Sequence, residues 1–179
     1  MDVTGKSLVL GTFLLGAAMA GGAWWFHYAS SDRAAKFWGG DDATLLVQSP
    51  RLELLHLGPP GDRPETDASE GPASPNLHVA DRVVVRKSDL SDARGLVHFR
   101  HALTQDSNYV WQPRLIAASD FDAAFALRFS SESDELVVLL NDDFTTLGRL
   151  SADGQEATLV DCPKMAPALR QYLTEVKAL

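Results

Sequence analysis

The sequence Leu136-Val137-Val138-Leu139-Leu140 decides the fold of this chain, because an uninterrupted apolar run of this length is typical of a strand covered on both faces. Before it, residues 123–129 alternate between large apolar side chains and small or charged ones, which predicts a half-buried strand. After it, we expect strands at residues 144–150 and 156–160, joined by a tight turn at Asp153-Gly154. Consecutive strands joined by short turns are antiparallel, so these four strands form a meander.

Two amphipathic helices are predicted to accompany this meander. In the first, over residues 93–105, Leu96, Phe99 and Leu103 share one face at helical spacing. The second lies near the C-terminus, is opened by Pro163 and carries one apolar stripe. The stripe comprises Met165, Leu169, Tyr172, Leu173, Val176 and Leu179. Because both helices need an apolar surface to cover, the pattern predicts an α+β fold, a mainly antiparallel sheet with two amphipathic helices packed on one face.

The segment before the first of these helices is less regular. Residues 30–50 predict two short helices separated by Gly39-Gly40, and residues 51–57 predict a strand. Residues 58–76 contain five of the nine prolines and four acidic side chains, and no aromatic residue, so we expect them to be disordered. We interpret this stretch as a long loop inside a hairpin, between the strand at 51–57 and another at 77–87, in preference to a domain boundary.

The N-terminal part contains a charge-free run over residues 7–26. Roughly 20 helical residues span the ~30 Å hydrocarbon core of a bilayer, so the run predicts a single transmembrane helix. Trp24, Trp25 and Tyr28 cluster at its C-terminal end, and we expect them to lie at the membrane interface. Gly16 and Ala20 recur at four-residue spacing, which is the spacing of faces that let helices approach closely in lipid.

An alternative interpretation is a secretory signal. Ala18-Met19-Ala20 matches an A-x-A cleavage site, and cleavage after Ala20 would release a chain that begins at Gly21. We favour the anchor, because the released chain would begin with the apolar sequence GGAWWF. Lys6 on one side and Arg33 with Lys36 on the other nearly balance, and a very short N-terminal tail favours an extracytoplasmic domain.

The predicted organisation has four parts. They are an N-terminal transmembrane helix or signal peptide at 1–29, a connecting helical segment and first strand at 30–57, a disordered Pro-rich acidic loop at 58–76 and an α+β domain at 77–179.

Composition restricts the partners. The chain has 16 basic and 24 acidic residues and a net charge of −8, which argues against nucleic acid, because phosphate binding requires a basic face. The single cysteine, Cys162, excludes an intramolecular disulfide and a Cys-based zinc site. We expect Cys162 to be a small buried residue rather than a nucleophile, since no histidine lies near it in sequence.

Few residues suggest chemistry. His98 and His101 are the best metal candidates, because i, i+3 spacing on a helix can place two imidazoles on one ion, but a third ligand is missing. Four aspartates are predicted to gather at one end of the sheet, where we expect solvated, capping roles: Asp120, Asp122, Asp142 and Asp143. The chain has no P-loop, G-x-S-x-G or H-E-x-x-H motif, so we predict no catalytic residue, no metal and no cofactor.

The C-terminal part resembles a known group. The sequence ALRFS at 126–130, the apolar run at 136–140, Asp153-Gly154 and the terminal amphipathic helix resemble a small domain of uncharacterised bacterial envelope proteins. The sequence LSDARGLVH at 90–98 is similar to planctomycete-type members of this kind. The resemblance extends from about Asp89 to the end and implies the fold. Its members have no assigned reaction, and the cysteine-containing segment that some carry after the apolar strand is replaced here by Asn-Asp-Asp.

These patterns predict a single-pass protein of the bacterial inner membrane, whose acidic α+β domain serves as an interaction or accessory module outside the cytoplasm. The expected partners are the lipid bilayer and another membrane protein, reached through the small-residue helix face. Tyr109, Trp111 and Pro113 predict an apolar loop that closes the core or offers a contact surface. The alternative function is a secreted small-ligand-binding protein released by cleavage after Ala20.

Overall fold

A computed structural model of the chain describes residues 11–22, 32–59 and 78–179. The helices are α2 (Asp32–Trp38), α3 (Gly40–Gln48), α4 (Leu96–Thr104) and α5 (Ala166–Glu175), with single 3-10 turns η1 (Asp106–Asn108) and η2 (Ala118–Asp120). The strands are β1 (Arg51–Leu57), β2 (His78–Val79), β3 (Arg82–Asp89), β4 (Val110–Ala117), β5 (Phe125–Ser130), β6 (Glu135–Leu140), β7 (Thr146–Leu150) and β8 (Glu156–Asp161). The strands form one sheet in the order β2-β3-β1-β5-β6-β7-β8-β4, and every neighbouring pair is antiparallel.

The predicted meander is confirmed as β5 to β8. The run at 136–140 is covered on both faces, since Val138 and Leu140 belong to one buried cluster and Leu139 to another. β1 matches its predicted bounds and lies between β3 and β5, with Leu54 opposite Leu127. The fold is therefore α+β with an antiparallel sheet, as the sequence predicts.

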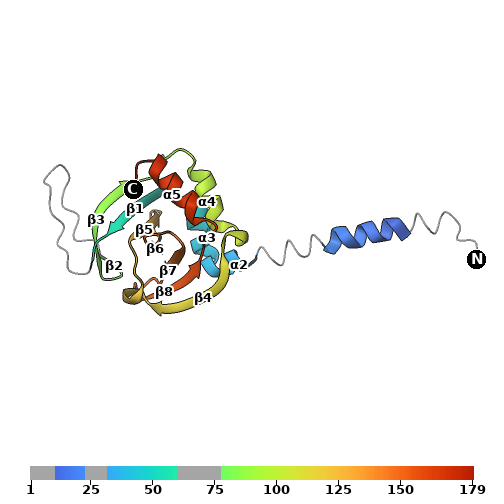
Figure 1. Ribbon diagram of the computed structural model, residues 1–179, viewed down its shortest axis with the longest axis horizontal. Coiled ribbons are helices and arrows are strands. Elements are labelled where there is room, and N and C mark those ends of the chain that lie inside the picture. The colour runs from blue at the N-terminus through green and yellow to red at the C-terminus, as the bar shows by residue number, and fades with distance from the viewer. Residues whose placement is uncertain (1–10, 23–31, 60–77) are drawn as a thin grey trace, which may run out of the picture.

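The larger core lies between the helices and one face of the sheet. Most apolar residues expected from helical spacing are there, including Phe99, Leu103, Leu169 and Leu173, whereas Leu179 lies beyond α5 and is 38% exposed. Trp38 of α2 and Leu46 of α3 are buried in the same cluster. Figure 1 shows α3, α4 and α5 together at the upper right of the domain, over the central strands.

A second, smaller core lies on the other face of the sheet. Leu55, Ala126, Leu139 and Ala157 point into it from four strands, and residues 118–123 with β2 cover it. Gly148 of β7 belongs at this face, where a Cβ atom would lie 2.7 Å from Cδ2 of Leu159. Glycine and alanine at these positions leave room for the residues that cover the second face, so both faces of the sheet are buried.

Two local predictions are wrong. Residues 77–87 are not one strand, because Ala80 and Asp81 adopt left-handed φ values of 51° and 61° and turn β2 into β3. Tyr109 to Pro113 is not a loop, because β4 begins at Val110 and pairs with β8. Pro113 is tolerated because β4 is an edge strand whose register shifts between Val110 and Arg114.

The helix starts also differ from prediction. α4 begins at Leu96, after Gly95 in the left-handed conformation, and neither Ser91 nor any other side chain caps it. Pro163 lies in a turn, and Pro167 is the proline in the first turn of α5. In both cases a turn, at residues 94–95 and 163–165, comes directly before the helix, so the helix begins a few residues later than predicted.

The N-terminal run is described over residues 11–22, which are helical and exposed. Gly16 and Ala20 lie in this helix, and a Cβ atom added at Gly16 would meet no atom within 4 Å. Across the described ranges, no helix is both long enough and apolar enough to cross a membrane. Trp24, Trp25 and Tyr28 lie outside the described residues, as does nearly all of the predicted loop at 58–76.

Candidate functional site

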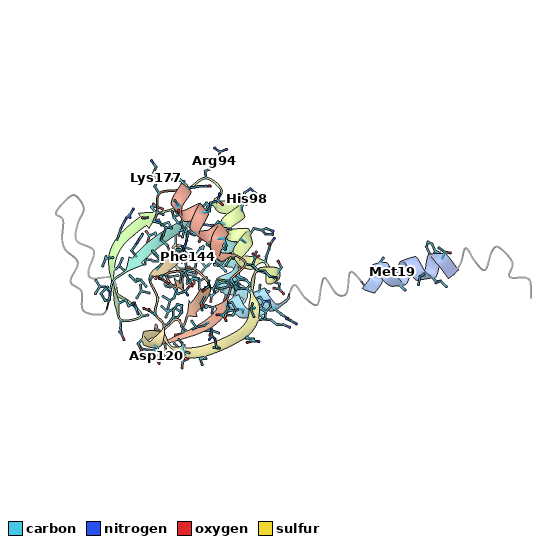
Figure 2. The ribbon with its side chains drawn as sticks, viewed as in Figure 1. Met19, Arg94, His98, Asp120, Phe144 and Lys177 are labelled. Carbon is cyan, nitrogen blue, oxygen red and sulfur yellow. The ribbon has the colours of Figure 1, made fainter. Side chains whose placement is uncertain are left out.

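The surface around α4 is the best candidate site. It contains two grooves, one on each side of the helix, and His98 lines both. Figure 2 shows His98 and Arg94 at the outer surface of the domain, pointing away from the core. The exposed face of α4 therefore contacts any molecule that binds in either groove.

The first groove lies between α4 and α5 and has a volume of about 470 Å³. One wall includes Phe99 and Ala102 of α4, with Gly95 just before that helix, and the other includes Leu169 and Tyr172 of α5. The rings of Phe99 and Tyr172 stack with centroids 4.9 Å apart. The lining is mainly apolar, so the groove suits an apolar group better than an ion.

The second groove lies between α4 and the turn from α3 to β1, and has a volume of about 520 Å³. Val47 and Val97 line it and are 52% and 78% exposed, which is unusual for two aliphatic side chains at one hollow. His101 and Thr104 add polar groups at its rim.

Arg100 lies beneath this surface and is only 8% exposed. Its guanidinium donates hydrogen bonds to the carbonyl oxygens of Val47 and Ser49, at 2.8 and 2.7 Å. Burial lowers the pKa of Arg100, and nearby Tyr172 partly opposes that shift. Among the described residues, Arg100 Nε, Ser49 Oγ and the Tyr172 hydroxyl have no hydrogen-bond partner.

Sequence reasoning missed Arg100. The signal was present, because position 100 is four residues after Leu96 and three before Leu103, which places it on the apolar side of α4. A basic residue on a buried face needs acceptors, and the C-terminal carbonyls of a neighbouring helix supply them. Which helix would supply them was not visible in the sequence.

The histidine pair does not form a site in the described chain. His98 and His101 are both exposed, and His101 shares a hydrogen bond of 2.9 Å with the Gln105 amide. His56 lies instead against Phe125, with its Nε2 atom 2.7 Å from the Ala178 carbonyl oxygen. Within the described ranges, no three side chains of the metal-binding types gather.

The aspartates lie at one end of the sheet, because Phe125 at the start of β5 is opposite Leu140 at the end of β6. They have different partners. Asp122 forms an ion pair with Arg82 at 2.9 Å, whereas Asp143 accepts hydrogen bonds from the hydroxyl and amide of Thr145. These hydrogen bonds lower the pKa of the Asp143 carboxyl. The Asp122 carboxylate pairs with Arg82 of β3, and the Asp143 carboxylate stabilises the turn before β7, so the two have separate structural roles.

Cys162 is fully buried and lies between β8 and α5. Its thiol donates to the carbonyl oxygen of Phe144 at 3.4 Å. Burial raises the pKa of the thiol to about 12, which keeps it protonated and unreactive at neutral pH. The prediction of a small buried residue is confirmed.

In comparisons with known proteins, no family model matched the chain, and neither a curated protein nor a solved structure showed significant similarity. The resemblance to bacterial envelope proteins therefore stays a prediction.

Proposed function

We propose that this chain is a single-pass membrane protein of the bacterial envelope, and that its α+β domain is an interaction or accessory module. The observation that carries the proposal is the charge-free run at 7–26. Its described part exposes large apolar side chains in the absence of lipid, with Phe13 75%, Leu15 63% and Met19 70% exposed. Exposed side chains of this size on a helix are costly in water and favourable in a bilayer.

An accessory role fits the candidate site. The grooves beside α4 offer aliphatic and aromatic surface, which is suited to holding a partner's side chains. In the anchor, Gly16 and Ala20 leave a smooth strip against which a second transmembrane helix can pack. We propose that the domain lies outside the cytoplasm.

The test is the state of the N-terminus and the membrane attachment of the full chain. The anchor predicts that the protein stays with the membrane after alkaline carbonate washing and keeps residues 1–20. A Leu14→Arg variant is expected to weaken insertion, because a cation at the centre of a bilayer costs about 3 kcal/mol, whereas the matched Leu14→Ala variant should stay bound. A mature chain that begins at Gly21 would rule the anchor out.

The second candidate is a secreted small-ligand-binding protein, favoured by the α4–α5 groove of about 470 Å³. It predicts cleavage after Ala20 and uptake of a small apolar probe such as anilinonaphthalene sulfonate. An Ala102→Phe substitution would fill the groove and abolish probe fluorescence, while Val97→Ala outside that groove would leave it unchanged. A folded chain that binds no probe would exclude this candidate.

A further inference from the structure

α2 lies beside η1 and the start of β4 on one side of the domain. The amide of Ala34 donates to Asp106 Oδ1 at 2.7 Å, which fixes the start of α2 against η1. The indole of Trp111 donates to the carbonyl oxygen of Asp106 at 3.0 Å, and its ring lies 6.0 Å from that of Phe37. Figure 1 shows α2 at the right of the domain and β4 running along its lower right.

Leu115 lies on the same side of the sheet as α2. Arg149 is opposite Thr158, and Thr158 is opposite Leu115, so the three side chains form one row across β7, β8 and β4. At the Arg149 end of this row, the guanidinium donates to the carbonyl oxygens of Phe37 and Trp38 at 2.5 and 2.8 Å. Two strand spacings, about 10 Å, therefore separate the backbone of Arg149, whose side chain reaches the end of α2, from that of Leu115.

The side chains of this surface, which we call the α2–β4 face, have a distinct composition. It comprises two exposed cations, two half-buried rings and one exposed leucine: Arg33, Lys36, Phe37, Trp111 and Leu115. Leu115 is 64% exposed, although it belongs to a strand.

Three acidic groups near the α2–β4 face have other partners. Asp42 forms an ion pair with Arg149 at 3.3 Å, and Asp161 forms one with Arg114 at 2.9 Å. The Asp106 carboxylate accepts from the α2 amides. Among the described residues, Arg33 and Lys36 form no ion pair with Asp42, Asp106 or Asp161, although the chain as a whole is acidic.

We infer that the α2–β4 face lies on the lipid headgroups, so that the domain has a fixed orientation on the membrane. This inference rests on the proposed anchor at 7–29. The proposed anchor ends at residue 29 and α2 begins at Asp32, and three residues can span at most about 10 Å, so the start of α2 would lie next to the bilayer surface. Lysine, arginine and tryptophan are the side chains that favour that interface.

A weak contact is sufficient here. The anchor makes docking of the domain intramolecular, and short tethers give effective concentrations in the millimolar range. The headgroup contact therefore needs little intrinsic affinity to be populated. It would leave α4 and α5, which lie at the top of the domain in Figure 1 and away from β4, free for a protein partner.

The experiment uses the full chain in phosphatidylcholine nanodiscs that contain a headgroup spin-labelled lipid. A fluorophore is attached to Leu115→Cys or, as a matched control, to Val97→Cys on α4. Both sites are exposed, and Cys162 is buried, so labelling is specific. We expect loss of fluorescence at position 115 and little loss at position 97. Adding Lys36→Glu should reduce the loss at 115.

Two outcomes would overturn the inference, and they are distinguishable. If the chain co-migrates with nanodiscs but positions 97 and 115 are quenched equally, or neither is quenched, the anchor stands and the fixed orientation is wrong. In the latter case the α2–β4 face is open to a protein partner instead. If the chain does not co-migrate with nanodiscs, the proposed anchor fails and the orientation fails with it.

Discussion

The guanidinium of Arg100 donates from Nη2 to the carbonyl oxygen of Ser49 across 2.7 Å, and this contact ties α4 to the end of α3. Ser49 is the C-cap residue of α3, and Val47, the second acceptor, lies in its last turn. The last carbonyls of a helix lack intrahelical partners and carry partial negative charge, so a buried cation there satisfies and stabilises them. Arg100 thereby also fixes the point at which β1 enters the sheet.

Replacing Arg100 with Met is expected to destabilise the domain by about 2–4 kcal/mol, because two buried carbonyl groups lose their donors. The measurement is urea unfolding followed by circular dichroism. Arg94→Met on the exposed side of the same region is the control and should change stability by less than about 0.5 kcal/mol. Equal stability of the two variants would show that solvent replaces the Arg100 contacts.

Gly148→Ala is expected to lower stability by about 1–2 kcal/mol, since the new methyl group would lie 2.7 Å from Leu159 and force the smaller core to rearrange. Gly40→Ala is the matched control. Gly40 opens α3 with nothing within 4 Å of the added Cβ, so that variant should be neutral or stabilised by about 0.5 kcal/mol. Comparing the thermal unfolding of the two variants distinguishes a steric effect of the added methyl group from an effect of alanine on backbone conformation. A Gly148→Ala protein as stable as the wild type would mean that Leu159 moves without cost.

Cys162 should resist alkylation in the folded protein. Its pKa is raised to about 12 by burial, from an ordinary value of 9.0, so the folded state keeps the thiol protonated. The corresponding stability is fully present below pH 9 and is lost as pH rises toward 12. Iodoacetamide at pH 8 is expected to modify unfolded chain rapidly and native chain only at the rate of unfolding. Rapid labelling of native protein would contradict the buried position.

Asp89 and Ser91 connect the end of β3 to the start of β1. The Ser91 hydroxyl donates to Asp89 Oδ1 at 2.6 Å and accepts from the Leu52 amide at 3.1 Å. Hydrogen bonds from Ser91 lower the pKa of the Asp89 carboxyl below its ordinary value of 3.8. A lowered carboxyl pKa stabilises the fold above pH 3.8, and that contribution is lost as pH falls through the folded-state value.

Substituting Ser91 with Ala should therefore raise the pKa of Asp89 toward 3.8 and cost about 1–2 kcal/mol, because the Leu52 amide loses its acceptor. Carboxyl chemical shifts from nuclear magnetic resonance titration report the first effect, and urea unfolding at pH 7 reports the second. Ser133→Ala, in an exposed turn, is the control. If Asp89 titrates identically in the wild type and Ser91→Ala, the hydrogen bond does not persist in solution.

Local pattern was sufficient for much of the fold. β1 and the meander were predicted because alternation and apolar runs report which faces of a strand are buried. Ala80-Asp81 was missed because neither residue is the glycine or asparagine that usually marks a left-handed turn. β4 was missed because an exposed edge strand that contains Pro113 has neither alternation nor continuous apolarity.

The candidate site was harder to predict than the fold. His98 and His101 were singled out by spacing, and the structure places them on the exposed face of α4. The groove residue Tyr172 was expected only as part of an apolar stripe, yet it stacks on Phe99 across two helices. Spacing along one helix reports which residues share a face, but it cannot report which other element comes to cover them.

By itself, the sequence determined the antiparallel α+β composition, the charge-free run at 7–26 and the burial of Cys162, because each follows from the chemistry of neighbouring residues. Only the tertiary structure decided that β1 pairs with β5, that Arg100 meets the end of α3, and that Leu115 shares a face with α2. These relationships join residues far apart in the chain. They depend on which surfaces pack together, and the periodicity of one segment carries no information about its distant partner.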